Sequence, residues 1–461
     1  MTTITPDEMK SLETLFMSET GTPSILLMEH AAQGVAAAIS RHAPKSARVL
    51  FLCGPGNNGG DGYAAARLWC LGGGQADVWE VTSAVRGDAA ILIHRLSDHP
   101  QIPVIAVDIP SGLDGTTGRA LGADVVRAAE TVTFHRIKQG LLLRQGVEYT
   151  GKITVQPILI RPGDDIDLGF DGLETLSPAA LAPLFARTPA LHKGDCGRAV
   201  IFCGSRGMVG AAAFCANACI RAGAGLTTLL CRESLLPMLQ VLAPGATCVP
   251  LPETNGLLTP QAARITRETL DKADAACIGC GCGLTPDVTM LLRVFAEADC
   301  PIVWDADALT LLATHDGILP LKEEDIITPH PGEAARLLEQ HVEFILDEPL
   351  DALSRLHDLC GCCVLLKGAR TLVSDGDATY ISLYGTPALA KGGSGDVLSG
   401  ILTALLCQRN RLSTSLSTSA LAAYGVLIHA LAGLRAEKRF GANCSTPQAL
   451  IDTIRLDDKE L

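Results

Sequence analysis

The sequence is poor in aromatic residues, and it lacks a basic block and a long apolar run. Aromatic residues make up 4% of its 461 residues, so we expect a core of Ala, Leu, Ile and Val. The net charge of −13 argues against nucleic acids and anionic membranes as partners. Apolar runs such as Ile401 to Cys407 are too short to span a bilayer. The start of the chain does not resemble a signal peptide, so we expect a soluble, cytoplasmic protein.

Cysteine is the one residue type with an unusual count, at 17. Most of these residues stand in apolar contexts, where a small buried thiol is the usual explanation. The stretches Cys280-Gly-Cys282 and Cys360-Gly-Cys362-Cys363 lack the paired CxxC or Cys/His spacing of a zinc site. Without an export signal the thiols should be reduced. Buried, reduced thiols are therefore the default interpretation.

The order of elements predicts the fold class. In both halves β-rich apolar runs alternate with helical patterns, which predicts α/β architecture with a parallel sheet covered on both faces. The chain is long enough for two or three domains. A stretch rich in Pro, Asp and Gly, residues 162–189, is the best boundary candidate. We therefore expect two doubly wound three-layer domains, at residues 1–165 and 183–461, joined by a linker at residues 166–182.

Several strands can be predicted from apolar runs bounded by turn residues. In the first half these are Arg48–Cys53, Asp77–Val81, Pro103–Ile109, Thr131–Phe134 and Gly151–Val155. In the second half they are Gly197–Cys203, Leu226–Leu230, Ala275–Ile278, Ile302–Trp304, Asp325–Thr328 and Val364–Lys367. A helix from Tyr63 to Leu71 is expected after the glycine-rich loop of the first half.

The most informative stretch is GTPALAKGGSGDVLSGI, residues 385–401. Glycines 392, 393 and 395 form a tight turn that leads into a helix, whose first N–H groups and dipole make an anion site. At its mouth, Asp396 could take a proton from a substrate hydroxyl while the amides hold a phosphoryl group. The alternative is a glycine hinge with Asp396 as N-cap. Three glycines in four residues exceed what a cap needs, which favours the functional interpretation.

Four other loops of the second half follow predicted strands and should meet at the carboxyl edge of one sheet. Two are glycine-rich, at residues 204–212 and 279–283. The third, Thr328 to Glu333, carries His330 between two prolines, and the fourth begins at Lys367. Each signal alone is weak, because a glycine after a strand is usually a turn. Their order, ending in GGSGD, indicates one combined site.

The motifs HKGDCGR, GAAAFCANACIRAGAG, DADAL, ITPHPGEAARLL, VLLKGART and AKGGSGDVLSGI, in this order, resemble the ADP/ATP-dependent NAD(P)H-hydrate dehydratases. The resemblance covers about Pro183 to Ile454 and implies a ribokinase-like fold. It also implies that ADP or ATP, with Mg²⁺, serves to phosphorylate the ring hydroxyl of the S form of NADHX or NADPHX. Elimination of the phosphorylated hydroxyl would then restore NADH or NADPH.

The same resemblance implies roles for individual residues. Asp396 would be the base that activates the hydroxyl, and the amides of Gly393 to Gly395 would form the anion hole. The implied nucleotide contacts are Lys367, Gly368, Ala369, Arg370, Thr371 and Gly395. The implied contacts with the hydrated substrate are Ala211, Gly283, His330 and Asp396. The chain departs from the family at Lys391, where a small hydroxyl residue is common, and at Cys280 and Cys282, where Pro and Leu are common; no role named here is lost.

The first half contains a pattern that imitates a dinucleotide-binding loop. Gly54 to Gly59 satisfies GxGxxG between a strand and a helix. However, Asn57 and Asn58 add amides to the turn, and Asp61 at the helix start would repel a pyrophosphate. These side chains better suit a ribose, a polar ring or a cation. A second loop, Asp108 to Gly115, follows another strand, and a purely structural turn at its end remains an alternative.

GPGNNGGDGY and AVDIPSGLDG resemble the Rossmann-like epimerase domain of the same repair pathway, which interconverts the R and S hydrates. The resemblance covers about Met1 to Ile160. It implies that the substrate is bound by Asn57, Asn58, Gly59, Gly60, Asp61 and Asp108. It also implies a potassium ion held by Asn58 and Ser111.

The first half departs from that family in one respect. The family has a further strand before the DIPSG strand, which ends in an Asp…Gly-Thr-Gly loop that contacts potassium and substrate. Only Thr82 to Gln101 is available here, enough for one helix and its turns. Loss of a sheet strand and a ligand aspartate should weaken binding. We therefore expect a truncated first domain with impaired epimerase activity.

Two other functions remain open at this point. A ribokinase-like kinase of a small alcohol or vitamin precursor would use the same GGSGD type of site, although HPGE and the fused first domain argue against it. The first domain could also be a binding or oligomerisation module without chemistry of its own. The resemblance suggests a homo-oligomer, with NADHX or NADPHX as the small-molecule substrate.

Overall fold

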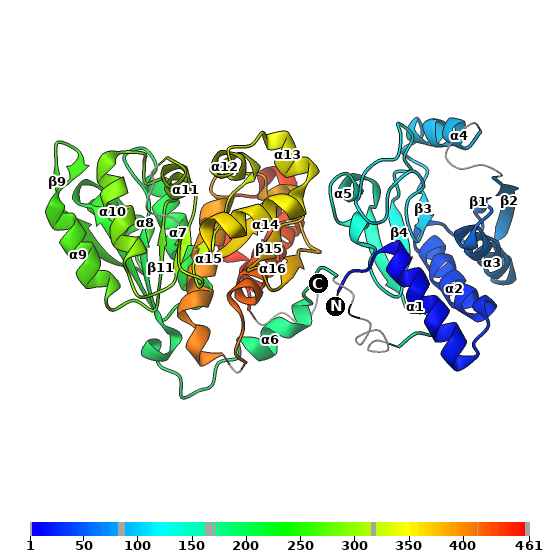
Figure 1. Cartoon of the computed structure of the whole chain (residues 1–461), viewed down its shortest axis with the longest axis horizontal. Helices are drawn as coiled ribbons and strands as arrows, with labels where there is room; N and C mark the ends of the chain where they lie inside the picture. Colours follow the sequence, from blue (N-terminus) through cyan, green and yellow to red (C-terminus); the bar gives the residue numbers. More distant parts are fainter. Residues whose placement is uncertain are drawn as a thin grey trace. The chain divides into compact units, whose positions relative to one another are not determined.

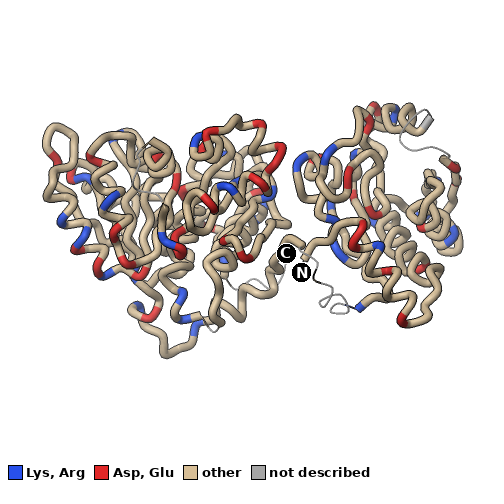
Figure 2. The backbone as a smooth tube through the Cα atoms, in the orientation of Figure 1, with Lys and Arg blue, Asp and Glu red and all other residues tan. Residues whose placement is uncertain are grey.

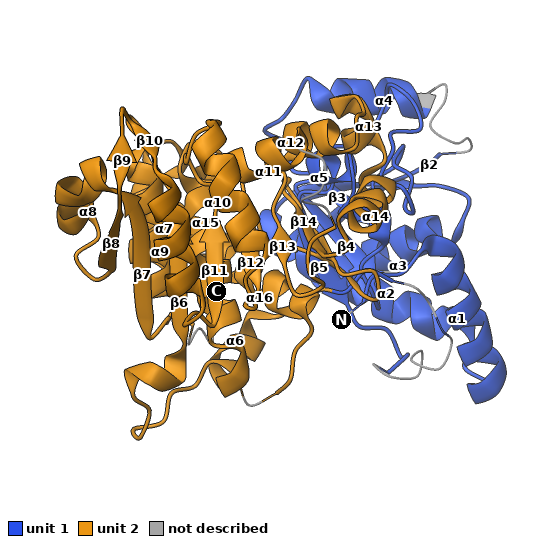
Figure 3. Ribbon diagram, turned by 60° about the vertical axis from the view of Figure 1, so that its left-hand side comes forward, with its two compact units in different colours: residues 1–174 blue, residues 175–461 orange. Residues whose placement is uncertain are grey.

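The computed structural model describes residues 2–81, 88–161, 169, 172–314, 320–412 and 414–456. Two compact units make up the chain, Met1–Glu174 and Thr175–Leu461 (Figure 3). The division falls inside the linker expected at residues 166–182. Residues 166–168, 170 and 171 of that linker lie outside the described residues.

The described residues of the first unit form two separate parallel sheets. One pairs β1 (Arg48–Cys53) with β2 (Gln75–Glu80), and the other has the order β3 (Ile105–Val107), β4 (Glu130–Phe134) and β5 (Lys152–Gln156). Strands β1 and β3 belong to different sheets (Figure 1), so among the described residues the strand order is interrupted where the sequence predicts a missing strand. Among the described residues between β2 and β3, the one regular element is helix α4 (Asp88–Ser97).

Three helices pack with these sheets: α1 (Pro6–Thr20), α2 (Ser24–His42) and α3 (Asn57–Leu71). Helices α2 and α3 pack against each other, α3 against β1 and α2 against β4. The prediction that the helix after the glycine loop begins at Tyr63 is wrong, because α3 begins at Asn57. A Cβ on Gly59 would lie 1.8 Å from the carbonyl oxygen of Gly54, so glycine lets the helix start directly against the strand end.

Glu130 gives the first unit a pH-dependent part of its stability. Its buried carboxylate accepts hydrogen bonds from Arg41, Thr154 and, at 2.8 Å, His42. Burial opposes the charge, but these hydrogen bonds lower the pKa of Glu130 from 4.5 to about 2. Because the folded pKa is the lower one, this stability is complete above pH 4.5 and is lost as the pH falls towards 2.

We expect Glu130→Gln to lower the free energy of unfolding of the first unit by about 2 kcal/mol at neutral pH, the usual contribution of hydrogen bonds to a charged group. The variant should also depend less on pH between 4.5 and 2. Acid titration followed by far-ultraviolet circular dichroism measures both effects. An acid transition identical to that of the wild type would contradict this assignment.

The second unit is built on a nine-stranded sheet with the order β16-β15-β14-β13-β12-β11-β6-β7-β8. The strands are β6 (Arg198–Phe202), β7 (Leu226–Arg232), β8 (Thr247–Leu251), β11 (Ala275–Ile278), β12 (Ile302–Trp304), β13 (Ile326–Ile327), β14 (Cys363–Leu366), β15 (Leu372–Ser374) and β16 (Thr379–Ile381). Pairing is parallel from β8 to β14, but β15 and β16 pair antiparallel. The strands predicted from the sequence all pair in parallel, whereas β15 and β16 were not predicted. The turn at residues 367–371 is too short for a parallel crossover, so β15 pairs antiparallel with β14.

Helices cover this sheet as in a doubly wound fold. The chain runs from β6 through β7 to β8, then returns to β11 on the other side of β6 and continues outwards (Figure 1). The crossover from β6 to β7 and the crossover from β11 to β12 run in opposite directions along the sheet. Because both are right-handed, α7 (Val209–Arg221) and α10 (Pro286–Ala296) lie on opposite faces. Helix α15 (Ser394–Cys407) packs against α7 and β11. The strand order thus reverses between β6 and β11, where open α/β sheets bind ligands.

Two features of the described chain, an apolar helix and the distribution of charged residues, are relevant to membranes and nucleic acids as partners. By length and composition alone, one helix of the described chain could cross a membrane, α16 (Thr418–Phe440). However, 83% of its most apolar window is buried, as in the core helix of a soluble protein. Along the described chain, Lys and Arg are interspersed with Asp and Glu (Figure 2).

Candidate functional site

The centre of the site in the second unit is a buried carboxylate, that of Asp305. It directly follows β12 and is 2% exposed. Lys367 Nζ donates to its Oδ1 at 2.8 Å, and Ser399 Oγ donates to its Oδ2 at 2.7 Å. Burial alone would raise the pKa of Asp305, but the ion pair with Lys367 and these hydrogen bonds outweigh it and hold the pKa below its usual value. The pair therefore remains charged although Asp305 is buried.

Lys367 also links Asp305 to the HPGE loop. Its Nζ lies 3.8 Å from Glu333 Oε2. Burial lowers the pKa of Lys367, but the two carboxylates outweigh it and the pKa is raised. His330 begins helix α12 (Pro331–Leu337), where its Nδ1 accepts the N–H of Gly332 at 3.0 Å. Its imidazole is 55% exposed, so His330 is oriented by the backbone and remains open to a ligand.

The GGSGD turn lies directly against the Asp305–Lys367 pair. Gly393 adopts φ +94° and α15 begins at the next residue, which leaves the first N–H groups of the helix without intrahelical partners. A Cβ on Gly395 would lie 3.7 Å from Lys367 Nζ and 3.8 Å from Asp305 Oδ2. Burial and the carboxylate of Asp305 raise the pKa of Asp396 to about 6. A carboxylate with this pKa is suited to accept a proton near neutral pH.

A buried histidine anchors the start of α15. Ser394 Oγ lies 3.1 Å from Nε2 of His429, which belongs to α16. Both side chains are buried, and burial lowers the pKa of His429 to about 4. The imidazole is therefore neutral at physiological pH. This contact fixes the first turn of α15, whose N–H groups are the ones predicted to hold an anion.

The two glycine-rich loops meet at the reversal of strand order. The N–H of Gly204 donates to the carbonyl of Cys280 at 2.8 Å, which joins the loop after β6 to the loop after β11. The N–H of Gly283 donates to Asp307 Oδ2 at 2.8 Å. A Cβ on Gly281 would lie 3.1 Å from the Cβ of Ala211. The loop that contains Gly283 thus packs against the start of α7, close to Ala211.

The loop at residues 367–371 is only partly directed towards the site. Gly368 and Ala369 are exposed. The guanidinium of Arg370 donates to the backbone carbonyl of Leu383, and burial lowers its pKa. Lys391, whose role the sequence left open, donates from Nζ to the carbonyl of Asn443 at 2.5 Å. Of these basic residues, Lys367 is the one that lies beside Gly395.

The first unit contains a second buried charge cluster. Asp108 follows β3 with φ +62°, and its Oδ1 lies 2.7 Å from Nζ of Lys138, a side chain that is 1% exposed. Thr133 Oγ1 also donates to Asp108 Oδ1, at 2.9 Å. Burial, Asp108 and Glu13 together raise the pKa of Asp61 to about 7. Burial also raises the pKa of Glu13. One buried ammonium group, that of Lys138, is therefore paired with Asp108 and also lowers the pKa of Glu13 and Asp61, which burial raises more strongly.

One contact joins the glycine-rich loop of the first unit to the strand that precedes Asp108. Asn58 Nδ2 donates to the carbonyl of Val107 at 3.5 Å, which brings the first loop against the end of β3. Asn58 and Ser111 are exposed and offer oxygen ligands of the kind that alkali and alkaline-earth cations prefer. Asp114 forms the structural turn considered above, because its Oδ1 accepts the N–H groups of Thr116 and Thr117 at 3.0 and 2.6 Å.

Sequence reasoning missed several residues of both sites. Asp305 had a visible signal, since it is an acid directly after a strand in the DADAL motif. Glu333 was part of the HPGE motif but was given no role. His429 and Glu13 lie inside long helices without a distinguishing pattern, and Lys138 follows an ordinary strand. These three residues could be identified only from the structure, where they are buried or half-buried beside other polar groups.

Both halves of the chain match families of known proteins. Residues 199–456 match the family model described as NAD(P)H-hydrate dehydratase, and residues 24–84 and 80–140 match the YjeF-related protein N-terminus. The bifunctional NAD(P)H-hydrate repair enzyme Nnr of Moorella thermoacetica is 32% identical, covering 97% of this chain and 95% of that protein. The enzyme of the same name from Escherichia coli is 35% identical, covering 89% and 85%.

This chain belongs to the bifunctional NAD(P)H-hydrate repair enzymes. The repair enzyme's second unit has the ribokinase-like fold. A ribokinase-like superfamily protein from Enterococcus faecalis superposes with a TM-score of 0.54 at 26% identity, covering 62% of this chain and 95% of that one. An ADP/ATP-dependent NAD(P)H-hydrate dehydratase from Bacillus subtilis, co-crystallized with ATP/Mg²⁺, gives 0.52 at 23% identity, covering 61% and 96%.

Proposed function

We propose that the second unit dehydrates the S form of NADHX and NADPHX with ADP or ATP, and that Asp396 is the catalytic base. Asp396 accepts the proton of the ring hydroxyl while the hydroxyl oxygen takes the terminal phosphoryl group of the nucleotide. The C–O bond then breaks, phosphate leaves with the bonding electrons, and loss of a ring proton restores the double bond. The position of Asp396 in the first turn of α15, beside Lys367 and Asp305, carries this proposal.

The other residues of the site bind and orient. The N–H groups at Gly395 and the charge of Lys367 suit the phosphates of a nucleotide, which would lie over residues 367–371. Mg²⁺ would accompany these phosphates, since it is usually held by phosphate oxygens and only one or two carboxylates. Ala211 lies at the start of α7, Gly283 in the loop after β11 and His330 in the loop after β13, and these three residues would contact the hydrated nicotinamide. The buried His429 takes no part in proton transfer and only anchors Ser394.

For the first unit we propose epimerisation of the R and S hydrates, impaired by the loss of a sheet strand. Asn57, Asn58, Gly59, Gly60, Asp61 and Asp108 would bind the hydrate, and Asn58 and Ser111 would hold a potassium ion through their oxygen atoms. Three observations support the loss. In the described residues the sheet is interrupted between β1 and β3. The family model matches in two pieces that meet at residues 80–84. The alignment with the Moorella enzyme runs over 514 positions, more than the 461 residues of this chain.

An equilibrated mixture of R and S NADHX tests both proposals in one experiment. With ADP or ATP and Mg²⁺, absorbance of NADH should rise quickly and stop near the fraction of S hydrate, because the R hydrate is converted too slowly. Adding a dehydratase-inactive variant of the E. coli relative, as a source of epimerase, should then complete the conversion. Rapid, complete conversion by this chain alone would contradict an impaired epimerase, and no conversion at all would contradict the dehydratase.

We further propose that the enzyme acts in the cytoplasm as a homo-oligomer. All 17 cysteines are free thiols, which suits a reducing compartment. Light scattering coupled to size-exclusion chromatography measures the assembly size directly, and a monomeric mass at micromolar concentration would contradict the second part of this proposal.

A further inference from the structure

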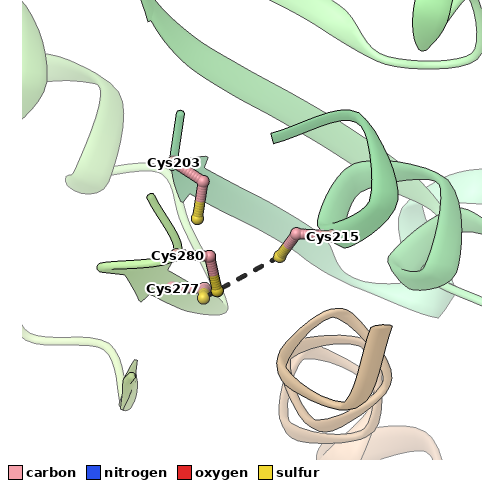
Figure 4. A group of neighbouring side chains, drawn as sticks. All are labelled: Cys203, Cys215, Cys277 and Cys280. Atoms are coloured by element: carbon pink, nitrogen blue, oxygen red, sulfur yellow. Dashed lines mark hydrogen bonds between the residues drawn. The ribbon is translucent and has the colours of Figure 1, made fainter. Parts of the chain in front are cut away.

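Four cysteine side chains converge in the core of the second unit. They are Cys203, Cys215, Cys277 and Cys280, hereafter the four-cysteine cluster. Their sulfur atoms all lie within 4.8 Å of one another, and the thiol of Cys215 donates to the sulfur of Cys277 at 3.9 Å. Figure 4 shows the four sulfur atoms close together, with Cys215 facing Cys277. They come from the ends of β6 and β11, from the loop after β11 and from α7.

The spacing of these sulfurs fits a tetrahedral metal ion. Zinc–sulfur bonds of about 2.3 Å in a tetrahedral site separate the sulfurs by roughly 3.8 Å. The sulfurs of Cys215 and Cys277 already have this separation, at 3.9 Å, and the widest pair is at most 4.8 Å apart. Small side-chain rotations could therefore close the site. Four sulfur ligands select soft ions such as Zn²⁺, Cd²⁺ and Cu⁺, and they disfavour Mg²⁺ and K⁺.

We propose that the four-cysteine cluster binds one soft metal ion of the zinc type, and that its occupation inhibits the adjacent dehydratase site. The binding reaction is M²⁺ + 4 RSH → [M(SR)₄]²⁻ + 4 H⁺, in which four metal–sulfur bonds replace four S–H bonds. No oxidant or reductant is required. The second part of the proposal rests on the proposed function, whereas the first part does not.

Metal binding would change the charges next to the active site. The thiol of Cys280 donates to Asp305 Oδ2 at 3.5 Å. A metal ion would remove this donor and leave negative charge beside the carboxylate that holds Lys367. We therefore expect the Asp305–Lys367 pair to rearrange, and the dehydration rate to fall.

Access to the cluster is restricted, which has a consequence for the kinetics of binding. All four residues are at most 1% exposed. Cys280 lies in the glycine-rich loop at residues 279–283, at the carboxyl edge of the sheet, so an ion would enter from the side of the active site. Because this loop must open first, we expect uptake of the metal to be slow.

Cadmium titration of the reduced, metal-free full chain tests the binding. One equivalent of Cd²⁺ should produce the ultraviolet charge-transfer absorbance of cadmium thiolates. Cys215→Ala should abolish this equivalent, and Cys203→Ala should do so from a different element. Cys219→Ala is the matched control, because Cys219 is equally buried on α7 but lies outside the cluster. Equal binding by the Cys215 and Cys219 variants, or no stoichiometric binding by the wild type, would overturn the proposal.

The dehydratase assay tests the inhibition separately. One equivalent of Cd²⁺ should lower the rate of the wild type and of Cys219→Ala at least tenfold, and a chelator should restore it. The Cys215→Ala variant should be unaffected. Binding without inhibition would overturn the second part of the proposal alone, and a metal-free enzyme without activity would instead count against the proposed function.

Discussion

Replacing Asp396 with asparagine is expected to lower the rate of S-NADHX dehydration about a thousandfold, which corresponds to about 4 kcal/mol of transition-state stabilisation. Asparagine has nearly the same size as aspartate but cannot accept the proton of the ring hydroxyl. Asp396 is half-buried in the first turn of α15, and the neighbouring Asp305 is already engaged by Lys367 and Ser399, so it cannot substitute as a base. Recovery of NADH absorbance measures the rate.

Two controls separate this loss from misfolding. Asp377→Asn makes the same chemical change at an exposed carboxylate between β15 and β16, and it should keep the wild-type rate. Nucleotide with Mg²⁺ should still raise the melting temperature of Asp396→Asn, because the N–H groups of α15 and Lys367 remain in place. A rate for Asp396→Asn within threefold of the wild type would exclude it as the base.

The sequence was most informative where local patterns determine the structure. The run RVLFLC predicts a strand at Arg48–Cys53, and β1 has these bounds, because β-rich apolar residues are followed directly by a glycine turn. The start of α3 could not be predicted in the same way. The many glycines before Tyr63 indicate a loop, but close packing of Gly59 on Gly54 lets the helix begin earlier. Here tertiary contact outweighs intrinsic helix propensity.

In the candidate site, too, local patterns could be predicted from the sequence, whereas contacts between distant strands could not. The turn of GGSGD into a helix could be predicted because its residues are adjacent in the chain. The partnership of Asp305 and Lys367 could not, since it joins the ends of two strands that are separated by β13 in the sheet. The four-cysteine cluster is a stronger case. Its members lack any metal-binding spacing, and only the adjacency of β6 and β11 brings them together.

Replacing Lys367 with methionine should be the most destabilising single change in the second unit's site. Methionine keeps the length and apolar stem of lysine but removes the charge, which leaves the carboxylate of Asp305 buried without its cation. Removing one member of a buried pair typically costs about 3 kcal/mol or more. Urea unfolding of the full chain measures this loss, and the transition of the first unit serves as an internal reference.

The double variant Lys367→Met/Asp305→Asn distinguishes the structural from the catalytic role of the lysine. It removes both charges, while an asparagine oxygen can still accept the hydrogen bond from Ser399, so most of the lost stability should return. Activity should not return, because no cation remains beside Gly395 to hold the phosphates. A double variant as unstable as Lys367→Met would show that the pair is not the source of the stability. A double variant that is stable and active would show that the nucleotide does not need Lys367.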